Sequence, residues 1–363
     1  MRFVYFTHSL MSCWNNGNAH FLRGVLRELL HRGHDVHSYE PVDGWSRMNL
    51  LREAGENADQ VDAELLAHAD FLTPDLDAML DSADVVLVHE WNDPALIEAI
   101  GRRRARGGRF VLLFHDTHHR AVTDPEAIGR LDLSAFDGVL AFGETLARVY
   151  REAGWGARCF VWHEAADTRL FHPPATEVED RRDVVWVGNW GDEERSQELS
   201  DFLLHPVQDL RLKLDVYGVR YPQDAQARLA QAGAHYRGWL PNARVPDVFA
   251  RYLMTAHIPR RAYATQLAGI PTIRVFEALA CGIPLICAPW NDMEYLFRPG
   301  IDYLQAATPD EMRAHMASVA ADAGLRHSMT AHGLETIRAR HTCAHRVDEL
   351  LATVAHLNVQ GAA

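Results

Sequence analysis

Glu277 interrupts an apolar run in the second half of the chain, and it is the first residue whose setting suggests chemistry. Its neighbours along the run are Val275, Phe276, Ala278, Leu279 and Ala280. A carboxylate on an apolar helix needs polar partners, and in a ligand crevice the paired hydroxyls of a sugar can supply them. An ion pair with Arg274, three residues earlier on the same helix, is the alternative.

Arginine carries nearly all of the positive charge, because the chain has a single lysine. Arg195 follows one predicted strand end, and Arg260 and Arg261 follow another. Guanidinium groups in such places can hold the oxygens of a phosphate. For Arg195 the alternative is a surface arginine that forms an ion pair with Glu194 or Glu198.

Two histidines end predicted strands in the first half of the chain. His89 ends a strand over 84–89, and His115 ends a strand over 110–115. Open α/β sheets place their sites at the carboxyl ends of parallel strands, so both histidines are candidates, together with Trp91. A capping histidine that its own loop satisfies is the alternative for His115.

The segment that begins at His115 continues with Asp116, His118 and His119, whose nitrogen and oxygen atoms suit zinc or manganese. Residues one to four apart on a loop share no fixed face, and no distant H-x-x-x-H supports them. We therefore predict no metal site. No serine stands in a G-x-S-x-G elbow, which argues against hydrolase chemistry.

The first half alternates between apolar strands and helices. Strands are expected over 1–7, 36–39, 84–89, 110–115, 138–142 and 159–162. The first strand, a helix and the second strand form a parallel βαβ unit. The loop before that helix contains Asn16, Gly17 and Asn18, where backbone N–H groups could approach an anion or an acceptor; an ordinary tight turn is the alternative. Residues 42–80 are polar and predicted to be helical.

The second half starts again with a strand over 183–187, which Gly188 and Asn189 follow. Gly218 follows a second strand over 212–217, and Gly238 and Trp239 follow a third. Other expected elements are strands over 252–259 and 283–288 and helices over about 193–204, 309–321, 327–341 and 347–357. The helix around Glu277 should end at Gly282, where glycine permits a left-handed C-cap.

Composition excludes several functional classes. The chain has 363 residues and a net charge of −13, which disfavours nucleic acid as a general partner. No apolar run reaches the roughly 18 residues that a membrane span needs. The N-terminus has no signal-peptide cleavage site, and the five cysteines lack C-x-x-C spacing, so we expect reduced thiols and a cytoplasmic protein.

The stretch from Gly269 to Glu294, with E-A-x-A-x-G over 277–282, resembles the nucleotide-sugar signature of retaining glycosyltransferases with the GT-B fold. It is most similar to the CgeB-like (spore-maturation-protein) subgroup. The resemblance implies an α/β protein with two Rossmann-like, doubly wound domains that face each other across a cleft. An N-terminal acceptor domain would span 1–165, with a C-terminal helix over 345–358 packing back on it. A linker over 166–182 would lead to a nucleotide-sugar domain over 183–340.

The resemblance also implies roles for single residues. Glu277 occupies the position of the second glutamate of the E-x7-E pair, which binds the nucleotide ribose, whereas Gly269 stands at the position of the first. Arg195 takes the place of a family lysine that stabilises the leaving phosphate, and Asn189 stands where the family has an arginine. His115 would touch the donor sugar. The predicted donor-binding residues are Gly188, Asn189, Gly218, Gly238, Trp239, Arg260, Arg261, Arg274 and Glu277; the predicted acceptor-binding residues are Asn16, Gly17, Asn18, His89 and Trp91.

These observations together predict a glycosyltransferase that moves a hexosyl group from a nucleotide diphosphate sugar to an acceptor. The resemblance implies a metal-independent, retaining reaction without a cofactor, in which the nucleotide sugar is a co-substrate. The acceptor could be a small molecule, a glycan or a protein. Two alternatives are a non-catalytic protein that binds nucleotide sugars and a nucleotide-sugar epimerase of the same fold.

Overall fold

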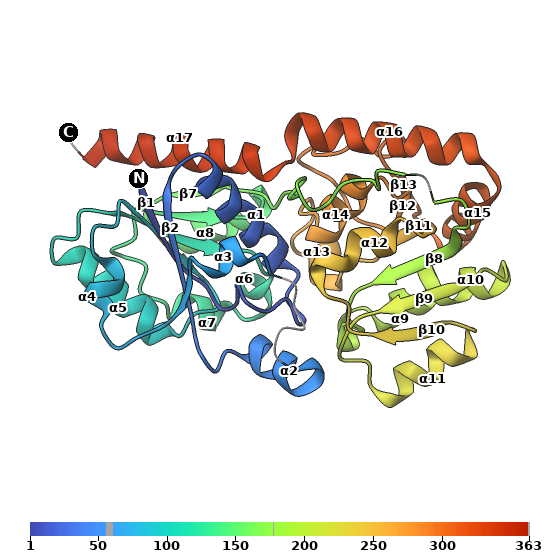
Figure 1. The fold of residues 1–363 in the computed structure, drawn as a ribbon, viewed down its shortest axis with the longest axis horizontal. Helices are drawn as coiled ribbons and strands as arrows, with labels where there is room; N and C mark the ends of the chain where they lie inside the picture. Colours follow the sequence, from blue (N-terminus) through green and yellow to red (C-terminus); the bar gives the residue numbers. More distant parts are fainter. Residues whose placement is uncertain (56–60, 177, 362–363) are drawn as a thin grey trace. The chain divides into compact units, whose positions relative to one another are not determined.

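The computed structural model describes residues 1–55, 61–176 and 178–361, which divide into two compact units. The first unit contains Met1–Ala165 and Cys343–Ala363, and the second contains Ala166–Thr342 (Figure 1). The segment 166–182, which we predicted to be a linker, therefore belongs to the second unit. No helix within the described ranges is long and apolar enough to cross a membrane.

The described part of the first unit forms a seven-stranded parallel sheet in the order β3-β2-β1-β4-β5-β6-β7. Its central strands are mostly apolar and buried, as expected for a parallel sheet with helices on both faces. The strands are β1 (Arg2–Phe6), β2 (Asp35–Glu40), β3 (Ala69–Phe71), β4 (Val85–His89), β5 (Val111–Asp116), β6 (Gly138–Ala141) and β7 (Cys159–Val161). Strand β3 corrects the helical prediction for 42–80, because three residues are too few to show a strand pattern.

Helices cover this sheet, and α17 packs along α1 (Figure 1). The indole Nε1 of Trp162 donates to the carbonyl oxygen of Arg346 at 2.8 Å, which ties α17 to the end of β7. The helices are α1 (Asn18–His31), α2 (Trp45–Ala54), α3 (Ala63–Leu66), α4 (Leu76–Leu80), α5 (Pro94–Ala105), α6 (Arg120–Thr123), α7 (Pro125–Gly129), α8 (Glu144–Ala153) and α17 (Cys343–Gly361).

The described residues of the second unit form a six-stranded parallel sheet in the order β10-β9-β8-β11-β12-β13. Apolar side chains of β8, β9 and β11 meet residues of the covering helices in one continuous core, which includes Val184, Val216 and Met254. The strands are β8 (Arg182–Val187), β9 (Leu214–Tyr217), β10 (His235–Gly238), β11 (Tyr252–His257), β12 (Leu285–Cys287) and β13 (Leu304–Gln305).

The longest helices of the second unit agree with the sequence. Helix α14 (Ile273–Cys281) ends at Gly282, whose φ of 69° is left-handed, as predicted. The other helices include α11 (Gln223–Gln231), α12 (Val245–Phe249), α13 (Arg261–Thr265), α15 (Pro309–Ala321) and α16 (Ala323–Arg340).

The single helix predicted over 193–204 is wrong. The chain instead forms a 3-10 turn, η1 (Asp192–Glu194), then α9 (Ser196–Leu199), a π-helical turn, η2 (Ser200–Leu204), and α10 (His205–Asp209). Arg195 lies between η1 and α9 with φ −156°, so it is not on a helix.

Both sheets reverse their strand order at an equivalent place. In the first unit the chain proceeds outward from β1 to β2 and β3, and then returns to build β4 beside β1. In the second unit β8 and β11 are related in the same way. Ligands of open α/β sheets bind outside the carboxyl ends of the strands at such switch points.

Candidate active site

Three glycines line up at the carboxyl ends of β8, β9 and β10. The N–H of Gly188 donates to the carbonyl oxygen of Tyr217 at 2.9 Å, and the N–H of Gly218 donates to the carbonyl oxygen of Gly238 at 2.8 Å. Gly218 has φ +154°. A Cβ at this position would lie less than 3.0 Å from the carbonyl oxygen of Gly188, which is closer than Cβ atoms approach other atoms in real structures. Only glycine allows this approach of one backbone to the other, so the structure brings three predicted donor residues together.

Arg195 connects the carboxyl ends of β8 and β11. Its Nη1 donates to the carbonyl oxygen of Ile258 at 3.1 Å, and its Nη2 donates to the carbonyl oxygen and Oδ1 of Asn189 at 2.7 and 2.5 Å. A Cβ at Gly191 would lie 2.5 Å from Nε of Arg195, so the guanidinium packs against this glycine turn. These hydrogen bonds go to Ile258 and Asn189, and not to Glu194 or Glu198 of the alternative that we considered.

The charge of Arg195 is partly desolvated. Burial, and then the positive charge of Arg260, lower the pKa of Arg195 to about 10, so it remains a cation at neutral pH. Arg260 lies on the same side, because its Nη2 is 3.4 Å from Oδ1 of Asn189 and it forms an ion pair with Glu194. Arg261 instead pairs with Glu198 at 3.0 Å and is largely exposed.

Glu277 is fully buried on α14, with two identified partners. It forms an ion pair with Arg274, and its Oε1 accepts a hydrogen bond from Nδ2 of Asn242 at 3.0 Å. The ion pair that we considered as the alternative is therefore present, and the ribose role of Glu277 remains a prediction. Asn242 follows the predicted donor-binding residues Gly238 and Trp239, so it connects their loop to the carboxylate; sequence reasoning missed it.

Gly269 occupies a turn that a glutamate would strain. Its φ is +98°, a region that L side chains rarely adopt, and a Cβ there would lie 3.2 Å from the Cβ of Met293. The absence of the first glutamate of the family pair therefore coincides with a glycine-specific turn that packs against the loop after β12.

His257 is a buried residue at this edge that sequence reasoning also missed. It ends β11, and its Nε2 lies 3.1 Å from Oγ1 of Thr272, the N-cap residue of α14. Its Nδ1 has no hydrogen-bond partner among the described residues. Burial, and then the charges of Arg195 and Arg274, lower the pKa of His257 to about 3. The strand was predicted to run to Pro259, which placed His257 inside it, whereas β11 ends at His257.

His115 is the penultimate residue of β5 in the first unit and is enclosed by aromatic rings. Its Nδ1 is hydrogen-bonded to the hydroxyl of Tyr5, and its ring centroid lies 4.9 Å from that of Trp162 and 5.4 Å from that of His89. Burial lowers the pKa of His115 to about 3, so the ring is neutral. Its buried Nε2 has no hydrogen-bond partner among the described residues. The contact with a donor sugar stays a prediction.

His89 ends β4 and contacts two other predicted acceptor residues, Asn18 and Trp91. Its Nδ1 accepts from the N–H of Trp91 at 3.3 Å, and its Nε2 lies 2.9 Å from the amide of Asn18 and 3.1 Å from Oγ1 of Thr117. Burial and the neighbouring charges lower the pKa of His89 well below its usual range. Asn18 starts α1 and Gly17 precedes it, whereas the Asn16 amide donates to the carbonyl oxygen of Ser9 at 3.0 Å.

The residues after His115 form hydrogen bonds to neighbouring side chains and backbone groups of the first unit. Asp116 accepts from the hydroxyl of Tyr150 at 2.6 Å and from the N–H of His118 at 2.9 Å, while Nδ1 of His119 lies 2.9 Å from Oγ1 of Thr123. Among the residues with described positions, no three His, Cys, Asp or Glu side chains are placed to hold a metal ion.

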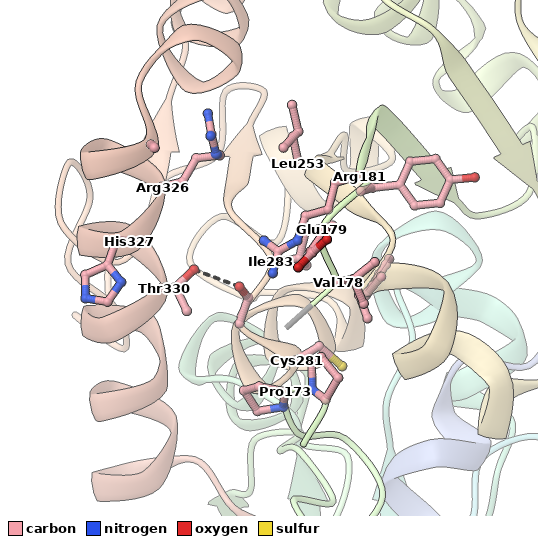
Figure 2. Close-up of a pocket in the computed structure, with 16 residues that line it drawn as sticks. Pro173, Val178, Glu179, Arg181, Leu253, Cys281, Ile283, Arg326, His327 and Thr330 are labelled. Carbon is pink, nitrogen blue, oxygen red and sulfur yellow. Dashed lines mark hydrogen bonds between the residues drawn. The ribbon is translucent and has the colours of Figure 1, made fainter. Parts of the chain in front are cut away.

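A separate cavity of about 630 Å³ lies at the amino-terminal ends of strands in the second unit. Figure 2 shows Arg181, Ile283 and Thr330 around it, and the Thr330 hydroxyl donates to the carbonyl oxygen of Gly282 at 2.7 Å. None of the predicted site residues lines this cavity. It therefore lies on the opposite edge of the sheet from the candidate donor residues.

Comparison with known proteins gives both a family match and structural neighbours. Residues 195–352 match the family described as "Glycosyl transferase-like". No curated protein sequence matches the chain.

The fold is shared with solved glycosyltransferases of low sequence identity. Sucrose-phosphate synthase (tll1590) from Thermosynechococcus elongatus has a TM-score of 0.70 and 12% identity, over 99% of this chain and 100% of that chain. Alr3699/HepE from Anabaena, solved with UDP and glucose, has a TM-score of 0.67 and 13% identity, over 98% and 100%. BGT from T4 phage, solved with UDP-glucose, has a TM-score of 0.60 and 12% identity, over 98% and 99%.

These likenesses confirm the predicted GT-B fold, with two parallel-sheet α/β units. The resemblance to the CgeB-like subgroup stays a prediction. The family match over residues 195–352 confirms the predicted enzyme class, a glycosyltransferase.

Proposed function

We propose that this enzyme transfers a hexosyl group from a nucleoside diphosphate sugar to a hydroxyl-bearing acceptor, without a metal ion and with retention of the anomeric configuration. The observation that carries the proposal is the group of glycine turns and arginines at the switch point of the second unit. There Gly188 and Gly218 bring two strand ends together, and Arg195 connects β8 with β11.

The start of α14 is suited to the diphosphate. Its N-cap residue, Thr272, forms no side-chain capping hydrogen bond, and its first turn has no acidic residue. The first N–H groups of the helix and its dipole therefore favour an anion. The Thr272 hydroxyl is 3.1 Å from His257, a neutral ring that adds no repulsive charge of its own.

Arg195 would stabilise the leaving group. Negative charge grows on the phosphate as the bond to the sugar breaks, and a cation fixed beforehand lowers the barrier. Arg195 is held by three hydrogen bonds to backbone and side-chain oxygens, so little reorganisation is needed. Arg260, which shares Oδ1 of Asn189, supplies a second positive charge.

Other residues of the second unit would bind the ribose and the base of the donor. Glu277 would accept hydrogen bonds from the ribose, with Asn242 beside it and Gly238 and Trp239 near the base. Two structural neighbours hold UDP with glucose or UDP-glucose, which supports a UDP-hexose as the first donor to test. We expect the reaction in the cytoplasm, where the cysteines stay reduced.

A thermal-shift panel of UDP-, GDP-, dTDP- and ADP-sugars tests the donor, because a ligand that binds only the folded state raises its stability. Release of the nucleotide is then followed over time with and without a panel of acceptors. We expect one nucleotide class to bind and its release to require an acceptor. NMR of the product anomer checks retention.

The same experiment separates the two alternatives. Tight binding without turnover across a broad acceptor panel would indicate a non-catalytic binding protein. Conversion of one donor sugar into another without any acceptor would indicate an epimerase. Activity that survives exhaustive chelation supports metal independence, and activity lost to chelation and restored by a divalent cation contradicts it.

A further inference from the structure

Trp91 presents an aromatic surface at the carboxyl end of β4. Its side chain is 44% exposed, unlike the buried rings of His89 and His115 beside it. The guanidinium of Arg120 lies over the indole, with its Cζ 4.4 Å from the ring centroid. The ring of His118 meets the indole in a T-shaped contact at 5.1 Å. The indole is therefore held in place while much of it faces solvent.

Arg120 is held through one of its three nitrogens. Its Nη1 donates to the carbonyl oxygen and to Oε2 of Glu90, both at 3.3 Å. Its Nε and Nη2 have no acceptor among the described residues and are not buried. These two nitrogens form the edge of a guanidinium that binds a carboxylate or a phosphate with two parallel hydrogen bonds.

Glu90 does not cancel the charge of Arg120 at neutral pH. Its side chain is fully buried, and burial together with the charge of neighbouring Asp116 raises the pKa of Glu90 well above its usual range. Burial also raises the pKa of Asp116 to about 6. Two buried carboxyl groups side by side retain a proton, so the pair carries less negative charge than two ionised carboxylates would. The positive charge of Arg120 is therefore not fully compensated by the carboxyl groups beside it.

We propose that Trp91 and Arg120 form an acceptor subsite for a sugar ring that carries a carboxylate or a phosphate. The exposed indole would stack on the apolar face of the ring, and Nε and Nη2 of Arg120 would bind the anionic group. The proposal rests on the proposed function, because it takes the first unit as the acceptor-binding unit. It deepens that function by naming the chemical class of the acceptor.

The test measures binding to the full chain without a donor. Calorimetric titrations compare glucuronate and glucose 6-phosphate with methyl glucoside, a neutral ring of the same shape. We expect the better anionic ligand to bind at least about tenfold more tightly than the neutral one, as two charge-assisted hydrogen bonds allow. The two anionic ligands show whether the site prefers a carboxylate or a phosphate.

Variants assign the preference to its residues. Arg120→Gln should reduce binding of the anionic ligands to the neutral level. Arg120→Lys, which keeps the charge but loses the planar fork, should fall between the two. Trp91→Ala should weaken all three ligands. The matched control is Arg130→Gln in the same unit, an arginine with a side chain 78% exposed and paired with Glu126, and it should change nothing.

Three results would overturn the subsite: equal affinity for charged and neutral rings, no binding of either anionic ligand, or an anionic preference that Arg120→Gln leaves intact. Donor binding is measured on the same preparations. If UDP-sugars still bind while the acceptor preference is absent, the subsite fails and the proposed function stands. If no nucleotide sugar binds, the proposed function fails first.

Discussion

The carboxyl ends of the two sheets lie at equivalent topological positions but carry different chemistry. In the first unit this edge is formed by aromatic and imidazole rings, and two of its histidines, His89 and His115, are buried and neutral. In the second unit the edge is formed by glycine turns and guanidinium groups, with Arg195 and Arg260 around Asn189. One topology therefore presents a mostly neutral site in one unit and a cationic site in the other.

The difference follows from how each edge is held together. Glycine turns let strand ends approach through their backbones, and the start of α14 beside them has neither a side-chain cap nor an acidic residue that would disfavour an anion. In the first unit the rings of His89, His115 and Trp162 pack against one another, and Arg120 supplies positive charge beside exposed Trp91. The topology alone does not determine the ligand, because the side chains at the switch point select it.

The largest effect is expected from Gly218→Ala. The new Cβ would collide with the backbone of Gly188, so we expect a loss of about 3 kcal/mol in the free energy of unfolding together with loss of donor binding. Denaturant unfolding measures it. The control is Gly233→Ala, which has a positive φ of 73° but open space around it, and should cost about 1 kcal/mol. Equal losses in both variants would show that strain, and not the backbone contact, is what Gly218 relieves.

Arg195→Ala should lower kcat about a hundredfold, because it removes a fixed cation from the position where negative charge develops. Donor affinity should change much less, since the contribution of the arginine grows only as the leaving group departs. The control is Arg313→Ala, a surface arginine paired with Asp310 at 3.0 Å. If thermal stability falls while kcat is unchanged, Arg195 serves only to connect β8 and β11.

Glu277→Ala should weaken nucleotide binding by about 1.5–3 kcal/mol, roughly tenfold to a hundredfold, as expected for the loss of a charged acceptor of hydroxyl hydrogen bonds. It also leaves partly buried Arg274 without its ion pair, so some stability is lost as well. Asp302→Asn separates the two effects, because Asp302 is another fully buried carboxylate of the same unit, paired with Arg298. Unchanged UDP affinity in folded Glu277→Ala would remove the ribose assignment.

The fold was largely readable from the sequence because its signals are local. The alternation of apolar strands with helices predicted two parallel sheets, and Gly282 and Pro309 marked helix ends and starts where the structure has them. Two local errors have physical causes. Strand β3 is too short to show a pattern. The helix predicted over 193–204 is interrupted at Arg195, whose φ of −156° is not helical and whose side chain donates to carbonyl oxygens after β8 and β11.

The candidate site was less readable because its partners are distant in sequence. Asn242 reaches Glu277 across 35 residues, and His257 reaches the start of α14 at Thr272. Both positions look ordinary until the strands are placed side by side. The position of Arg120 depends on its contact with Glu90, which lies beside Asp116. These two carboxyl groups come from the ends of two different strands, so their proximity is not visible in the sequence.

The two edges share one feature, a buried neutral histidine at a strand end. The pKa is about 3 for both His115 and His257, compared with about 6.5 in an unfolded chain. Between these values the unfolded chain binds a proton that the folded chain does not. Each histidine therefore lowers the free energy of unfolding as the pH falls below 6.5.

The smallest expected effect tests this shared feature. When the pH is lowered from about 7 to about 5.5, each histidine should lower the free energy of unfolding of the wild type by about 1 kcal/mol. The variant His257→Gln lacks this loss for one histidine, so its difference in stability from the wild type should shrink by that amount. His115→Gln should show the same convergence, but less cleanly, because the pKa of adjacent Asp116 is about 6. Folding raises the pKa of that carboxyl group, so its contribution has the opposite sign and stability falls as the pH rises toward 6. Because His257 has no such neighbour among its charged contacts, a pH-independent difference for His257→Gln would mean that its ring binds a proton as readily in the folded protein as in the unfolded chain.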